Sequence, residues 1–166
     1  SQTNPNIKIS SDNKNILLAE NNTAILLDTS GAQISRYIGH SLPVNTHDIS
    51  DNGKFILTGS IDKTARLWTR EGKTLKVINT DEKYFKLSFL PGESIFQIVD
   101  NNSVRLYDIN GVLIQKIIVT NNNPIIYSPK NRSFYYTDNE GIHFAKMKEP
   151  VDKFLMTNNN THLSIQ

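Results

Sequence analysis

The fold is decided by residues 39–78, which read GHSLPVNTHDISDNGKFILTGSIDKTARLWTREGKTLKVI. This stretch holds four apolar runs separated by short polar turns, at 44–49, 55–60, 64–68 and 74–78. The first turn contains Asn52-Gly53, a pair that favours a tight hairpin because both residues tolerate positive φ. The pattern therefore predicts four antiparallel strands in succession.

The third run recurs along the chain at steps of about 41, 39 and 38 residues. Its copies are 23–28 (TAILLD), 64–69 (TARLWT), 103–108 (SVRLYD) and, more faintly, 141–146 (GIHFAK). A period of about 40 residues is typical of four-stranded propeller blades. The same four-strand pattern fits around each copy, and residues 151–156 are expected to form the last outer strand. Most of these strands are apolar on both faces. Such strands are expected in sheets that lie between neighbouring sheets.

The decisive stretch resembles one complete WD40 repeat. The residues that carry the resemblance are Gly39-His40, Val44, the turn 50–54, 57–60, Asp62-Lys63-Thr64 and Arg66-Leu67-Trp68. The resemblance implies an all-β fold, a β-propeller of WD40 type with about four four-stranded antiparallel blades. We expect residues 1–166 to be one propeller segment, with blades at approximately 4–38, 40–79, 81–119 and 121–156. Residues 157–166 resemble the opening of the fourth copy and are expected to start a fifth blade.

Four blades and one strand are fewer than a WD40 ring usually has, so the chain is expected to be an incomplete ring or part of a larger propeller. Two interpretations remain: a piece of a longer propeller, or a homo-oligomer whose copies complete a ring. A closed monomer of four or five blades is a minor alternative. An open arc would expose apolar sheet faces at both ends.

The resemblance also implies a structural hydrogen-bond relay within the second blade, made by His40, Ser60, Asp62 and Trp68. The chemistry fits, because an indole only donates, an ionised carboxylate only accepts, and hydroxyl and imidazole groups do both. A catalytic dyad of His40 and Asp62 is the alternative, and the structural role is favoured. Since no other copy has a Trp at the equivalent place, we expect the second blade to be the most rigid.

An acidic residue recurs at the turn after the second strand of each copy, and strand order places all four on one rim: Glu20, Asp62, Asp100 and Asp138. An acidic ring that recognises a basic peptide or a cation is one interpretation, since function concentrates in loops on rigid scaffolds. Turn geometry alone is the other, and it is favoured. Together with the apolar Leu42 and Ile61, the residues Glu20, Asp100 and Asp138 form the predicted partner-binding rim.

Composition and motifs exclude several classes of function. The 18 basic and 16 acidic side chains give a net charge of +2, too balanced for a dedicated nucleic-acid or membrane surface. The absence of Cys excludes disulfides and thiolate-bound metals, and the four His lack metal-ligand spacing. No phosphate-binding loop or nucleophile elbow occurs. We therefore expect no catalytic residues, no metal and no cofactor.

The expected function is a non-catalytic, cytoplasmic scaffold for protein–protein interaction that binds a protein or peptide partner at a propeller rim. One alternative is a regulatory or sensing WD40 segment of a larger multidomain protein. Another is a small-ligand or sugar-binding propeller, which would need aromatic residues that recur at one equivalent position. The aromatic residues do not recur in that way, at Tyr37, Trp68, Tyr84, Tyr107 and Tyr135.

Overall fold

The computed structural model describes residues 7–92, 94–118, 126–138 and 141–147 of the 166-residue chain. In these ranges every regular element is a β-strand, and the strands form four antiparallel sheets. The same ranges contain no helix with the length and apolar character needed to cross a membrane. The expected all-β fold is confirmed. The strand predicted at 151–156 and the blade start predicted at 157–166 lie outside the described residues.

Each sheet follows the order of the sequence. The first contains β1 (Ile7–Ile9), β2 (Asn15–Glu20), β3 (Thr23–Asp28) and β4 (Gln33–Ile38). The second contains β5 (Val44–Ile49), β6 (Phe55–Ser60), β7 (Thr64–Thr69) and β8 (Thr74–Asn79). The third contains β9 (Lys86–Phe89), β10 (Ile95–Val99), β11 (Ser103–Asp108) and β12 (Leu113–Ile118). The fourth contains β13 (Ile126–Ser128), β14 (Ser133–Asp138) and β15 (Gly141–Lys146).

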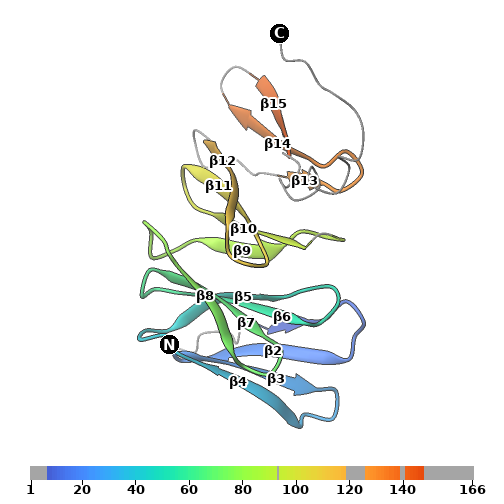
Figure 1. Ribbon diagram of the computed structural model, residues 1–166, viewed down its shortest axis with the longest axis vertical. Coiled ribbons are helices and arrows are strands. Elements are labelled where there is room, and N and C mark those ends of the chain that lie inside the picture. The colour runs from blue at the N-terminus through green and yellow to red at the C-terminus, as the bar shows by residue number, and fades with distance from the viewer. Residues whose placement is uncertain (1–6, 93, 119–125, 139–140, 148–166) are drawn as a thin grey trace, which may run out of the picture.

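The sheets stack face to face in chain order, and the stack does not close into a ring (Figure 1). Between the first two sheets, Trp68 and Ile56 pack against Leu17, Leu26 and Tyr37. A separate apolar cluster lies between the third and fourth sheets. Because each large side chain buried in this way contributes about 1.5–3 kcal/mol, packing between sheets holds the stack together. This open stack of blades confirms the predicted fold class.

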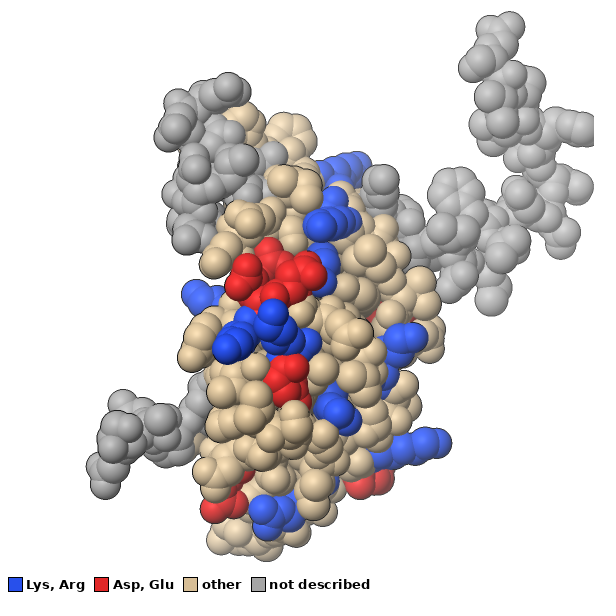
Figure 2. Space-filling model, turned by 90° about the vertical axis from the view of Figure 1, so that its left-hand side faces the viewer, with Lys and Arg blue, Asp and Glu red and all other residues tan. Residues whose placement is uncertain are grey.

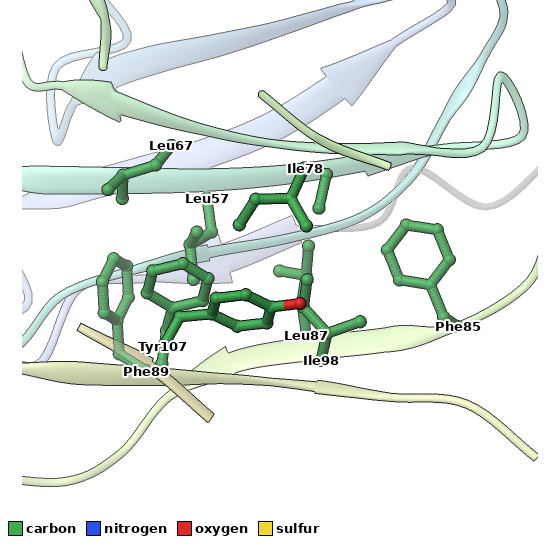
Figure 3. Packing of buried hydrophobic residues seen from close by; sticks show 10 residues of the cluster. Leu57, Leu67, Ile78, Phe85, Leu87, Phe89, Ile98 and Tyr107 are labelled. Atoms are coloured by element: carbon green, nitrogen blue, oxygen red, sulfur yellow. The ribbon is translucent and has the colours of Figure 1, made fainter. Parts of the chain in front are cut away.

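The cluster between the second and third sheets is rich in aromatic residues (Figure 3). Leu57 and Leu67 of the second sheet face Phe89 and Tyr107 of the third. The Tyr107 ring stacks on Phe96, with ring centroids 5.4 Å apart. Such pairs stabilise a core beyond the area that they bury.

A buried carboxylate joins three successive sheets at their innermost strands. Asp48 of β5 accepts a hydrogen bond from the Phe89 backbone N–H of β9 at 2.8 Å. Its other oxygen lies 3.0 Å from the Lys8 ammonium of β1. The Asp48 side chain is almost fully buried, so both partners compensate a charge that would otherwise be costly.

Strand direction divides the connections between two rims. The connections between sheets (39–43 and 80–85) share one rim with the turns 21–22, 61–63 and 100–102; we call it the connector rim. Backbone hydrogen bonds hold it together, from Val44 N–H to the Asn21 carbonyl and from Thr80 N–H to the Lys63 carbonyl, each at 2.8 Å. Among the described residues, the turns between the first and second strands and between the third and fourth strands of a sheet lie at the opposite rim, which we call the hairpin rim.

Candidate functional site: the connector rim

A chain of polar side chains runs from the core of the second sheet to the connector rim. The indole N–H of Trp68 donates to the Thr58 hydroxyl at 2.8 Å. The Thr58 oxygen lies 2.8 Å from Nε2 of His40, and Nδ1 of His40 lies 2.9 Å from an Asp62 carboxylate oxygen. The relay therefore links β6, β7, the connection 39–43 and the turn 61–63.

The hydrogen-bond pattern assigns the proton positions along this relay. The Asp62 carboxylate accepts only, so Nδ1 of His40 carries the proton, and Nε2 accepts from the Thr58 hydroxyl. Burial lowers the pKa of His40, and the nearby Asp62 opposes this shift without reversing it. His40 is thus a neutral donor to the carboxylate, which suits a structural link.

Asp62 joins the turn 61–63 to the connection 39–43 by hydrogen bonds. One carboxylate oxygen accepts from the Ser41 backbone N–H at 3.0 Å, besides accepting from His40. The other accepts from the hydroxyl and the backbone N–H of Thr64, at 2.6 and 2.9 Å. Burial alone would raise the pKa of Asp62, but the bonds from Thr64, His40 and Ser41 outweigh burial and lower it to about 2. The carboxylate therefore stays ionised and serves the local structure.

The glycine before His40 is explained by close approach. A Cβ at Gly39 would lie 2.6 Å from Nη1 of Arg66 and 3.1 Å from the Trp68 ring. The Arg66 guanidinium itself lies 5.8 Å from the centroid of the Trp68 ring. A side chain at residue 39 would therefore displace the Arg66 guanidinium and press on the Trp68 ring.

The hydroxyl at the centre of the relay is Thr58 and not the predicted Ser60. Ser60 donates to the Leu42 carbonyl at 2.8 Å and accepts from the Asp62 backbone N–H at 3.0 Å, so it braces the rim beside the relay. Trp68 lies opposite Ile56 in the sheet. At about 3.3 Å per residue, Ser60 lies about 13 Å along β6 from Ile56, and Thr58 lies about half that distance from Ile56. Thr58 and Ser60 share one face of β6, so alternation alone does not distinguish them. The register set by the turn 61–63 does, because it places Thr58 nearer to Trp68.

Apolar side chains project from the rim that the relay supports. Leu42 is 46% exposed and follows the anchored His40-Ser41 pair. Ile61, whose N–H donates to the Pro43 carbonyl at 3.2 Å, is only half-buried. Tyr84, which sequence reasoning did not place on the rim, is 73% exposed on the next connection. The connector rim therefore offers large apolar groups on a hydrogen-bonded backbone.

The predicted acidic residues do not form a free ring. Glu20 is exposed and lies 3.5 Å from Arg36. The Asp100 carboxylate is nearly buried. It accepts hydrogen bonds from the Ser103 hydroxyl, the Ser103 backbone N–H and Arg105. Asp138 ends β14, and its side chain lies outside the described part of the structure. On the face shown in Figure 2, acidic side chains lie beside basic ones instead of forming a field of one sign.

Comparison with known proteins bears on the same stretch. The WD40 family model, described as "WD domain, G-beta repeat", matches residues 31–69. Residues 31–69 therefore match a WD40 repeat. This repeat begins before β4 of the first sheet and runs through β5, β6 and β7 of the second, so it contains the whole relay. The predicted resemblance is confirmed.

Two curated relatives match parts of the chain that carries this WD40 repeat. Nuclear distribution protein nudF of Aspergillus terreus is 33% identical over 72 residues, which is 41% of this chain. Transducin beta-like protein 2 of Mus musculus is 42% identical over 43 residues, which is 26% of this chain. The matched segments span 16% and 10% of those two proteins.

Proposed function

We propose that the chain is a non-catalytic interaction scaffold that binds a protein or peptide partner at its connector rim. The observation that carries this proposal is the exposed Leu42 on a connection anchored by His40 and Asp62. An anchored backbone loses little conformational entropy on binding, which favours affinity. The WD40 repeat supports the general role of a scaffold, and a cytoplasmic location is part of the same proposal.

The rim chemistry favours a partner with an apolar contact group. Leu42, Ile61 and Tyr84 supply aliphatic and aromatic surface, and Tyr is frequent among residues that dominate binding energy. Glu20, Asp100 and Asp138 flank this surface in the proposal. The Asp100 carboxylate already accepts hydrogen bonds from Ser103 and Arg105. Ionic contacts are therefore expected to contribute less to the affinity for the partner than apolar contacts.

Quantitative affinity capture with the immobilised chain tests the proposal. Leu42→Asp should reduce recovery of the specific partner at least about tenfold, which corresponds to about 1.4 kcal/mol. Val112→Asp is the matched control, since Val112 is 59% exposed at the hairpin rim. The control should capture the partner like the unmodified chain, and both variants should melt like it. If Leu42→Asp and the unmodified chain recover the same amount of partner, the partner does not bind at the connector rim.

A further inference from the structure

The sequence contains two Asn-Gly pairs, Asn52-Gly53 and Asn110-Gly111, and both lie in turns of the hairpin rim. An asparagine carboxamide that precedes glycine can react with the next backbone nitrogen, because glycine has no side chain to shield that nitrogen. Both asparagines are exposed, and both glycines have positive φ, at 67° for Gly53 and 75° for Gly111. Each glycine N–H donates to a backbone carbonyl of its own turn, at 2.8 and 2.9 Å. Exposure and backbone bonding therefore treat the two pairs alike.

Side-chain hydrogen bonds hold the Asn52 carboxamide in its turn. Oδ1 of Asn52 accepts from the Ser50 hydroxyl at 2.9 Å and from the Lys54 backbone N–H at 3.0 Å. These bonds make the carboxamide part of the turn that joins β5 to β6. Rotation of the carboxamide toward the Gly53 nitrogen would break both bonds.

The Asn110 carboxamide has no such role in the turn that joins β11 to β12. Here the Asp108 carboxylate organises the turn, since one of its oxygens accepts from the backbone N–H groups of Asn110 and Val112 at 2.9 and 2.8 Å. Among the described residues, the Asn110 carboxamide makes one long contact, from Nδ2 to the other Asp108 oxygen at 3.3 Å. The Asn110 side chain can therefore rotate while the turn keeps its shape.

We propose that Asn110 is a site of spontaneous deamidation, whereas its turn protects Asn52. The Gly111 backbone nitrogen bonds to Cγ of Asn110 and loses its proton, and this proton leaves with the Nδ2 group as ammonia. The product of this step is a succinimide ring. Water then opens the ring at either carbonyl and yields aspartate or isoaspartate. The net reaction consumes water and releases ammonia, without oxidation or reduction.

The reaction changes the turn between β11 and β12. A carboxylate at residue 110 cannot donate as Nδ2 does, and it adds a negative charge beside Asp108. Isoaspartate also lengthens the main chain of a tight turn, in which a Cβ at Gly111 would already meet the Lys76 side chain. Deamidation therefore loosens this turn of the hairpin rim. The residues of the connector rim are not altered, so this proposal is independent of the proposed partner binding.

Incubation of the folded 166-residue chain in mildly alkaline buffer, followed by proteolysis and mass spectrometry, tests the proposal. The mass increase that accompanies the exchange of an amide NH₂ for a hydroxyl should accumulate in the peptide that contains Asn110. Deamidation of Asn52 should be at least about tenfold slower, because two hydrogen bonds must break first. Asn110→Gln is the matched control. It retains a carboxamide, but its cyclisation needs a larger ring, so the mass of this peptide should stay constant.

Two further measurements show whether the turns cause the difference between the two sites. In guanidinium chloride both turns are lost, and the deamidation rates of Asn52 and Asn110 should become similar. In folded Ser50→Ala, which lacks one of the two bonds to Oδ1 of Asn52, deamidation of Asn52 should accelerate several-fold. Each of four results would overturn the proposal: no deamidation of Asn110, equal rates in the folded chain, a difference that persists in denaturant, or a folded Ser50→Ala chain without acceleration at Asn52.

Discussion

The Trp68 indole nitrogen lies 2.8 Å from the Thr58 hydroxyl oxygen, deep between the first two sheets. This contact begins the relay that ends at Asp62 on the connector rim. A buried polar group without a partner costs about 1–3 kcal/mol, so each member of the relay depends on its neighbours. The core of the second sheet and the shape of the rim are thereby coupled.

Removing the central hydroxyl should destabilise the protein strongly. Thr58→Ala would leave the Trp68 N–H and Nε2 of His40 buried without partners, and we expect a loss of about 2–4 kcal/mol in the free energy of unfolding. Thr58→Ser keeps the hydroxyl and should lose about 1 kcal/mol or less. Urea denaturation measures both. Equal losses for the two variants would argue that the methyl group and not the hydroxyl matters.

Acid should destabilise the fold in two stages. Burial lowers the pKa of His40 and His47 from the ordinary value of 6.5, and neither Asp62 beside His40 nor Asp48 beside His47 reverses this. Lys8 near His47 adds to the lowering. The unfolded chain therefore binds more protons below about pH 6.5, and stability falls as the pH decreases through that value. A second fall follows as the pH drops from 3.8 toward the pKa of Asp62 at about 2.

Melting temperature measured between about pH 8 and about pH 4 tests the first stage. His47→Gln removes one of the two titrating groups and should flatten the slope below pH 6.5 relative to the unmodified chain. A melting temperature that is constant or rises toward acid would contradict the assignment of neutral, buried imidazoles.

The carboxylate that joins three sheets should matter more than a surface acid. Asp48→Ala loses a charge-assisted bond to Phe89 N–H and the ion pair with Lys8, and we expect a loss of about 1.5–3 kcal/mol. Asp81→Ala, at an exposed position, is the control and should change stability by about 0.5 kcal/mol or less. Chemical denaturation compares the two, and similar losses would show that Asp48 does not join the sheets.

The strand pattern was largely predictable because it depends on local signals. The predicted strands at 44–49 and 55–60 agree with β5 and β6, since turns at Asn52-Gly53 and 61–63 delimit them. Contacts across the stack were not predictable in this way. The bond from Phe89 N–H to Asp48 joins residues 41 positions apart, and no periodicity in either strand signals it.

The site was predicted less completely than the fold. His40, Asp62 and Trp68 are brought together, but alternation places Thr58 and Ser60 on one face, and the sequence pattern alone did not discriminate between them. Exposure of Tyr84 also depends on how neighbouring sheets stack, because an aromatic residue in a strand-rich chain is equally compatible with the core.

Hydrogen exchange followed segment by segment tests the central claim, that the relay makes the second sheet the most stable part of the stack. The fair comparison is β6 and β7 against β10 and β11, because both pairs are covered on both faces and only the first contains the relay. We predict that the slowest amides of β6 and β7 exchange at least about tenfold more slowly than those of β10 and β11. We also predict that His40→Ala removes this difference. Equal protection of the two pairs, or a difference that survives His40→Ala, would contradict the account.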